Sequence, residues 1–102
     1  MRISVIGDYS LPEYKELLQI VKMAKPEEKV IDLSRHQSLS WDKMRKSRFE
    51  DITGSHLVVI GADFRNSVEA RRDITHAQNL SKECKIYREG QFLPFPQYAQ
   101  KI

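Results

Sequence analysis

Residues 56–77, with the sequence HLVVIGADFRNSVEARRDITHA, predict a buried strand, a short loop and a helix. Residues 57–60 are consecutive apolar residues, and three of the four are β-branched, as expected of a strand covered on both faces in a parallel sheet. Residues 61–66 follow as a polar loop. The stretch therefore predicts one strand-and-helix unit of an α/β protein.

The helix of this unit has a capping residue and one apolar face. Ser67 is suited to cap a helix that begins at Val68, with Glu69 in its first turn. The spacing i, i+3, i+4 and i+7 places these residues on one face: Ala70, Asp73, Ile74 and Ala77. A carboxylate on a face that packs against a sheet costs free energy unless it is paired or lies at the open end of the sheet. We therefore take Asp73 as the main functional clue.

The remaining elements follow the same alternation of strand and helix. Strands are expected at residues 3–6, 30–33 and 85–88, because these are short apolar runs. A first helix is expected after Ser10, which has capping-box spacing to Glu13, and a second from Trp41 to near Gly54. Three strand–helix repeats imply right-handed crossovers and a parallel sheet.

The predicted fold is a small three-layer, flavodoxin-like α/β domain over residues 1–90. Its sheet has four parallel strands in the order 2-1-3-4, with helices on both faces. Residues 91–102 are aromatic and contain two prolines, and we expect an irregular C-terminal tail there. The tail would pack on its own domain or reach a partner subunit.

A ligand site is expected where the winding of such a sheet reverses, beyond the carboxyl ends of the first and third strands. The loop after the first strand brings Gly7, Asp8, Tyr9 and Ser10 to this point. The loop after the third strand brings Asp63, Asn66 and Ser67. Two helix N-termini would also point there, which suits a phosphate or a hydroxyl-rich ligand.

Charge and its distribution argue against a nucleic acid polymer as a partner. The formal net charge is only +3, and acidic and basic residues are interleaved. The densest basic segment holds Lys43, Arg45, Lys46 and Arg48, which we interpret as a solvated helix face, so no nucleic acid polymer is expected as a partner.

The numbers and positions of the cysteine and histidine residues predict neither a disulfide nor a metal site. Cys84 is the single cysteine and is expected to be a packing residue, so neither an intramolecular disulfide nor a cysteine-based zinc site is predicted. The three histidines share no short spacing, so we expect no metal site. The enzyme that we consider below would also need no cofactor. No apolar run approaches a membrane span of about 20 residues, and no signal-peptide pattern is present. We therefore expect a cytoplasmic protein without a membrane partner.

The chain resembles the nucleoside 2-deoxyribosyltransferase-like superfamily, which includes deoxynucleoside-monophosphate N-glycosidases. The resemblance covers roughly residues 2–88 and is most specific in the third helix. The family has Ser or Asp, then Gly two positions on, Glu six on and Ala ten on. At these offsets the chain has Ser67, Glu69, Asp73 and Ala77. Asp73 thus replaces a catalytic Glu, and Glu69 replaces a Gly.

The resemblance implies an enzyme that acts on the N-glycosidic bond of a deoxynucleoside or its 5′-monophosphate. Asp73 would be the nucleophile, and Asp8 or Asp63 would handle the proton or bind the sugar. Tyr9 would stack on the base, while Ser67 and backbone N–H groups would hold a hydroxyl or phosphate. The resemblance also implies a homodimer or higher homo-oligomer, with the second helix or the tail as its contact surface.

Three alternatives stay open at this point. Because Asp is one methylene shorter than Glu, Glu69 is a second candidate for the catalytic carboxylate. The chain is alternatively a catalytically degenerate nucleotide-binding or assembly module on the same fold. A phospho-acceptor signalling domain is a third interpretation, because Asp8 and Asp63 end the first and third strands.

Purely structural roles are the competing interpretation of single residues. Asp73 would then be paired with Arg2, Arg72 or His76. Trp41 would be a core anchor rather than a platform for a base.

Overall fold

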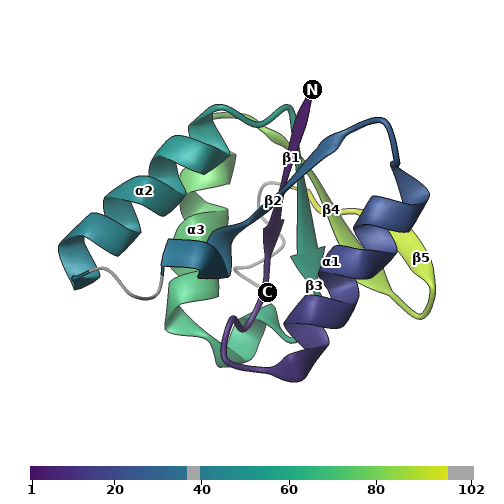
Figure 1. Cartoon of the computed structure of the whole chain (residues 1–102), viewed down its shortest axis with the longest axis horizontal. Helices are drawn as coiled ribbons and strands as arrows, with labels where there is room; N and C mark the ends of the chain where they lie inside the picture. The colour runs from purple at the N-terminus through teal and green to yellow at the C-terminus, as the bar shows by residue number, and fades with distance from the viewer. Residues whose placement is uncertain (37–39, 97–102) are drawn as a thin grey trace.

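A five-stranded mixed sheet forms the centre of the computed structural model, which describes residues 1–36 and 40–96 (Figure 1). The strand order is β2-β1-β3-β4-β5. Four strands run parallel, namely β1 (Arg2–Ile6), β2 (Lys29–Asp32), β3 (Leu57–Gly61) and β4 (Glu83–Arg88). The edge strand β5 (Gln91–Pro94) runs antiparallel to β4.

Three helices cover the two faces of the sheet. The helix α1 (Pro12–Ala24) lies on one face, and α2 (Trp41–Thr53) and α3 (Val68–Asn79) lie side by side on the other (Figure 1). Two 3₁₀ turns, η1 (Leu33–His36) and η2 (Phe64–Asn66), follow β2 and β3. The structure is thus an α/β fold with helices on both faces of the sheet, as the alternation of elements predicts.

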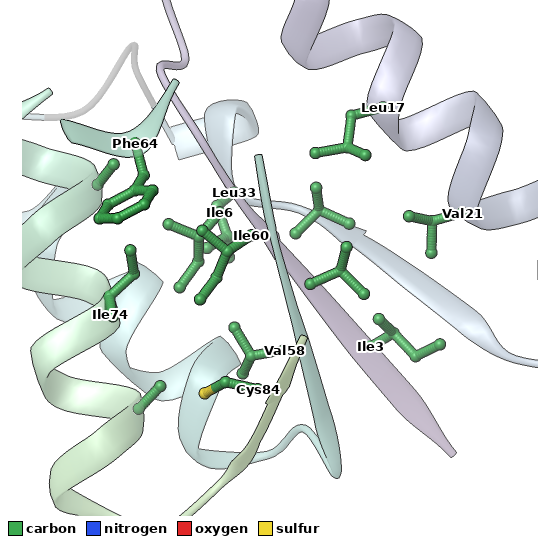
Figure 2. Packing of buried hydrophobic residues seen from close by; sticks show 14 of the residues in the cluster. Ile3, Ile6, Leu17, Val21, Leu33, Val58, Ile60, Phe64, Ile74 and Cys84 are labelled. Atoms are coloured by element: carbon green, nitrogen blue, oxygen red, sulfur yellow. The ribbon is translucent and has the colours of Figure 1, made fainter. Parts of the chain in front are cut away.

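The buried strand β3 is the centre of the core. All five of its residues are buried, and its register pairs Val58 with Ser4 of β1 and with Cys84 of β4. Figure 2 shows apolar side chains on both sides of the sheet, with Leu17 of α1 on one side and Ile74 of α3 on the other. A strand buried on both faces gains hydrophobic stabilisation from each, which explains its continuous apolar sequence.

The expected order 2-1-3-4 of the parallel strands is confirmed, but the expected end of the sheet at the fourth strand is wrong. Residues 91–94 form β5 instead of an irregular tail, because Glu89 and Gly90 both have positive φ and make a tight two-residue turn. Phe95 then packs edge-to-face against Phe64, with 5.4 Å between ring centroids. Tyr98 and the rest of the expected tail lie outside the described residues.

The capping residue predicted from the sequence is correct for α3 and wrong for α1. Ser67 accepts a hydrogen bond from the backbone N–H of Ala70, so the predicted N-cap is confirmed. The expected capping box at Ser10 is wrong, because Leu11 is the N-cap of α1 and has no side-chain cap. Ser10 instead donates its hydroxyl to Asp8 Oδ1 at 2.6 Å.

Two further expectations about the second helix are wrong. Arg48 is 2% exposed instead of lying on a solvated face, and Trp41 is 48% exposed instead of anchoring the core. The buried stripe of α2 consists of Met44, Arg48 and Ile52, which are spaced four residues apart. Cys84 is buried as expected, and burial raises the pKa of its thiol to about 11.

Replacing Phe95 by Ala tests whether the chain after β4 belongs to the core. The buried ring contacts Phe64, so Phe95→Ala should lower the free energy of unfolding by about 3 kcal/mol. Leu93→Ala, at an exposed position of the neighbouring strand, is the control and should cost about 0.5 kcal/mol. Equal costs for the two variants in urea unfolding would contradict this packing.

Candidate functional site

Asp73 lies at the centre of a buried polar cluster. Its side chain is 1% exposed on the face of α3 that meets the sheet. The hydroxyl of Tyr9, from the loop after β1, donates to Asp73 Oδ2 at 2.6 Å. The guanidinium of Arg48, from α2, places Nε 3.1 Å from the same oxygen. Three segments that are distant in sequence therefore meet at one carboxylate.

The ion-pair partner of Asp73 differs from the three expected ones. Arg2, Arg72 and His76 form no ion pair with Asp73 among the described contacts, and Arg48 takes this place. The sequence contains a signal for the correct partner, since Arg48 interrupts the apolar stripe of α2 as Asp73 interrupts that of α3. Two opposite charges on two buried helix faces satisfy each other when the helices pack together.

Several polar atoms of this cluster are buried without a hydrogen bond. Arg48 Nε, Arg48 Nη1 and Asp73 Oδ1 have no hydrogen-bond partner within the described part of the chain. The guanidinium also lies 5.2 Å from the centroid of the Tyr9 ring, and its Nη1 is 3.8 Å from Oε2 of the half-buried Glu69. The cluster is therefore held by charge and by a single hydrogen bond from Tyr9.

Burial dominates the acid–base properties of the cluster. It raises the pKa of Asp73 from an ordinary 3.8 to about 6, although the Tyr9 hydrogen bond and the charge of Arg48 oppose this shift and Glu69 adds to it. Burial, followed by the charge of Asp73, also raises the pKa of Tyr9 well above 10. Tyr9 therefore stays protonated and remains the hydrogen-bond donor at neutral pH.

A separate cleft of about 300 Å³ opens at the carboxyl end of the sheet, between α1 and the ends of β1, β3 and β4. This is the predicted switch point between the first and third strands. Its charged lining consists of four carboxylates and one guanidinium: Glu13, Glu16, Asp63, Glu89 and Arg88. The cleft is therefore acidic, which disfavours a phosphate and suits a neutral or cationic ligand with hydrogen-bond donors.

Two glycines, Gly7 and Gly61, expose the backbone to the cleft because they have no side chain. A Cβ atom on Gly61 would lie 3.0 Å from Asp63 Oδ1, and one on Gly7 would lie 3.2 Å from the Tyr14 ring. These positions have no room for a side chain without a shift of Asp63 or Tyr14. The loops after β1 and β3 therefore meet here, and they bring the predicted residues Gly7 and Asp63 together.

The other predicted site residues do not line this cleft. Asp8 accepts hydrogen bonds from the backbone N–H and the hydroxyl of Ser10, so these two residues stabilise the turn in which they lie. Ser67 caps α3, and Asn66 is exposed at the end of η2. Tyr9 is buried in the Asp73 cluster.

Tyr14 connects the cleft with the Asp73 cluster and was not predicted as a site residue. Its ring lines the cleft and contacts Tyr9 edge-to-face, with 4.9 Å between centroids. Its hydroxyl donates to the Val5 carbonyl and accepts from the Leu33 N–H, which fixes the ring in place. The sequence pattern identifies Tyr14 only as part of the apolar stripe of α1.

Three further cleft residues come from the end of β4 and the start of the β4–β5 turn. Tyr87, Arg88 and Glu89 line its far side, and sequence reasoning missed them. Tyr87 and Arg88 are the last residues of β4, which the sequence predicts only as a strand, and Glu89 begins a turn that lies beyond the expected end of the sheet.

Comparisons with protein-family models, with curated proteins and with solved structures give no match for this chain. Within residues 1–36 and 40–96, no helix is long and apolar enough to cross a membrane. The same residues contain no group of three or more His, Cys, Asp or Glu side chains placed to hold a metal ion. The class of protein is thus defined by the fold and the site alone, as an α/β protein with an acidic cleft at its switch point.

The raised pKa of Asp73 predicts a pH-dependent stability. Between pH 3.8 and about 6 the folded protein retains a proton on Asp73 that the unfolded chain releases, so the free energy of unfolding falls as the pH rises through this window. The titration of Asp73 should lower the free energy of unfolding by at most on the order of 3 kcal/mol. Urea unfolding at a series of pH values measures it.

The variant Asp73→Asn isolates this effect from the titration of other carboxylates. It lacks the titrating proton, so it should not show this fall in the free energy of unfolding. At pH 7 it should be less stable than the wild type, because Arg48 remains buried without its counter-charge. The same pH dependence in both proteins would contradict the raised pKa.

Proposed function

We propose that this chain is a nucleoside-binding module whose ligand occupies the acidic cleft beside α1. The observation that carries the proposal is the cleft of about 300 Å³ at the switch point, where two glycines expose the backbone beside the Asp63 carboxylate. Small-molecule sites of α/β sheets occur preferentially at this place.

Size and charge support a nucleoside as the ligand class. A volume of about 300 Å³ is at the lower end of the range for small-molecule pockets, which fits a compact ligand. The sugar hydroxyls of a nucleoside would donate hydrogen bonds to carboxylates such as Asp63 and Glu13, and the half-buried Tyr87 ring offers a surface for the base. A 5′-phosphate would add negative charge to a lining that has only Arg88 to balance it.

The position of Asp73 supports binding over catalysis. A nucleophile must reach the anomeric carbon, but Asp73 is buried and does not line the cleft. The Tyr14 ring both lines the cleft and packs against Tyr9, the hydrogen-bond donor to Asp73. Asp73 in this conformation is a structural carboxylate.

A second candidate function is the cleavage of the N-glycosidic bond of a deoxynucleoside or its 5′-monophosphate. The observation that favours it is the combination of an Asp73 pKa of about 6 with a buried Oδ1 that has no hydrogen-bond partner in the described chain. After an opening movement, the carboxylate would attack the anomeric carbon as the protonated base leaves, and water would hydrolyse the glycosyl ester. Glu69, which is more exposed, would be the second carboxylate.

Ligand-induced thermal stabilisation tests the first candidate. Saturating deoxyadenosine or deoxycytidine should raise the melting temperature, with a stabilisation of about 2.7 kcal/mol when the ligand is present at about 100 times its Kd. The corresponding 5′-monophosphates should stabilise less, because the cleft is acidic. Failure of all nucleosides to stabilise the protein, or tighter binding of the monophosphates, would contradict the proposal.

Asp63→Asn locates the ligand in the cleft. Loss of this carboxylate should weaken nucleoside binding by roughly tenfold, the value of one hydrogen bond to a charged group. Glu27→Gln is the matched control, since it removes one carboxylate at an exposed position outside the cleft. Its affinity should equal that of the wild type, and equal weakening in both variants would place the ligand elsewhere.

Chromatographic detection of free base separates the two candidates. A binding module leaves deoxynucleosides and their 5′-monophosphates intact even at high protein concentration. Base release that is lost in Asp73→Asn would instead establish the second candidate. Release that survives in Asp73→Asn but is lost in Glu69→Gln would assign the chemistry to Glu69.

A further inference from the structure

We propose that the outer face of α2 and α3 binds single-stranded nucleic acid, independently of the ligand in the cleft. We call this face the α2–α3 surface and define it by six residues: Trp41, Arg45, Phe49, Arg71, Arg72 and His76. The two helices lie side by side on the face of the sheet opposite α1 (Figure 1). The surface therefore combines residues 41–49 and 71–76, which are separate in sequence.

Guanidinium groups and aromatic rings alternate on this surface. The guanidinium carbon of Arg45 lies 5.4 Å from the centroid of the Trp41 ring and 5.2 Å from that of Phe49. Arg72 reaches across from α3 to the Trp41 ring at 5.6 Å. Phe49 in turn stacks on His76, with 4.2 Å between centroids and 7° between planes. These planar groups hold one another in place across the two helices.

The charge of the surface is concentrated in one hollow. A hollow of about 370 Å³ between the two helices is lined by Arg45, Arg71 and Arg72 and contains no acidic residue in its lining. Val68 at its rim is 53% exposed, and Trp41 beside it is 48% exposed. Two acidic residues, Asp42 and Glu50, line a second hollow along the adjoining outer side of α2. The charge of the first hollow therefore favours an anionic occupant.

Single-stranded nucleic acid matches both features of the surface. Its phosphates complement the three guanidinium groups, and its unpaired bases stack on aromatic rings and on guanidinium planes. An acidic peptide would match the charge, but its Asp and Glu side chains would bring no ring to the exposed Trp41, whereas every nucleotide brings both a phosphate and a base. A second copy docked through the same face would place arginine against arginine, because a two-fold interface joins identical surfaces.

The sequence expectation of no nucleic acid partner rested on the low net charge, on the interleaving of acidic and basic residues, and on the interpretation of the densest basic segment as a solvated face of the second helix. In the structure one of those residues, Arg48, is buried and belongs to the Asp73 cluster. The charge of the α2–α3 surface is instead completed by Arg71 and Arg72 of α3. Only the packing of the two helices brings these residues to one face.

Fluorescence anisotropy with labelled single-stranded DNA and RNA of about 12 nucleotides, a length within the usual site sizes, tests the proposal. Binding should weaken with salt, and the slope of log K against log salt should be about −2 for three neutralised phosphates. Trp41 is the single tryptophan, so its fluorescence should change on binding and report contact at this surface. DNA and RNA in parallel show which sugar the surface prefers.

The double variant Arg71→Gln/Arg72→Gln should weaken binding by roughly tenfold and reduce the salt slope to about −0.7. Its matched control is Lys15→Gln/Lys22→Gln, which removes the same charge from exposed positions of α1 on the opposite face. The control should bind as the wild type does, and both variants should retain the wild-type melting temperature.

Three outcomes would overturn the proposal. They are no binding at low salt, equal weakening in the two double variants, and binding of a polyglutamate peptide as tight as that of the oligonucleotides. The last outcome would assign the α2–α3 surface to an acidic protein partner. A nucleoside that stabilises the protein without displacing the oligonucleotide would show that the cleft and the surface are separate sites.

Discussion

The ion pair between Arg48 and Asp73 is the constraint on which the arrangement of this molecule depends. Its two charges lie on buried faces of α2 and α3, where neither side chain has access to water. Each charge offsets the desolvation cost of the other, because burying an isolated ion in the protein interior costs several kcal/mol of folding free energy. The Tyr9 hydroxyl adds a hydrogen bond from the loop after β1 and ties that loop to both helices. The pair thus sets how α2, α3 and the first loop meet.

Two local surfaces on opposite sides of the sheet differ in the sign of their charge. On the α1 face, four carboxylates surround the cleft at the carboxyl ends of the strands. On the other face, α2 and α3 expose three arginines beside aromatic rings. A formal net charge of +3 conceals this separation, since composition averages over faces that only the fold distinguishes. Our two proposals, a neutral nucleoside in the cleft and a single-stranded nucleic acid on the α2–α3 surface, correspond to these two local charges.

Sequence reasoning predicts elements whose cause is local. The apolar run of β3 and the capping residue Ser67 of α3 can be recognised from a few neighbouring residues, and the structure contains both the strand and the cap. The strand β5 was missed because its turn uses Glu89 with positive φ, where Asn or Asp is the usual signal. The meeting of Gly7 and Asp63 at the switch point was predictable, because it follows from the strand order.

The candidate site was less predictable, because it depends on contacts between helices. Asp73 and Arg48 each interrupt an apolar helix face in the sequence, but only the packing of α2 on α3 shows that these two residues are partners. Periodicity classed Tyr14 as a core residue and Arg88 as part of a strand. Both line the cleft because of the positions of α1 and of the β4–β5 turn relative to the sheet.

A double-mutant cycle between Arg48 and Asp73 tests the central claim most directly. Arg48→Met and Asp73→Leu each leave one buried charge without its partner, so each should lower the free energy of unfolding by about 3–5 kcal/mol. The double variant removes both charges and should cost less than the sum by about 2 kcal/mol or more. Strictly additive losses in urea unfolding would show that the two residues act independently and would contradict this account.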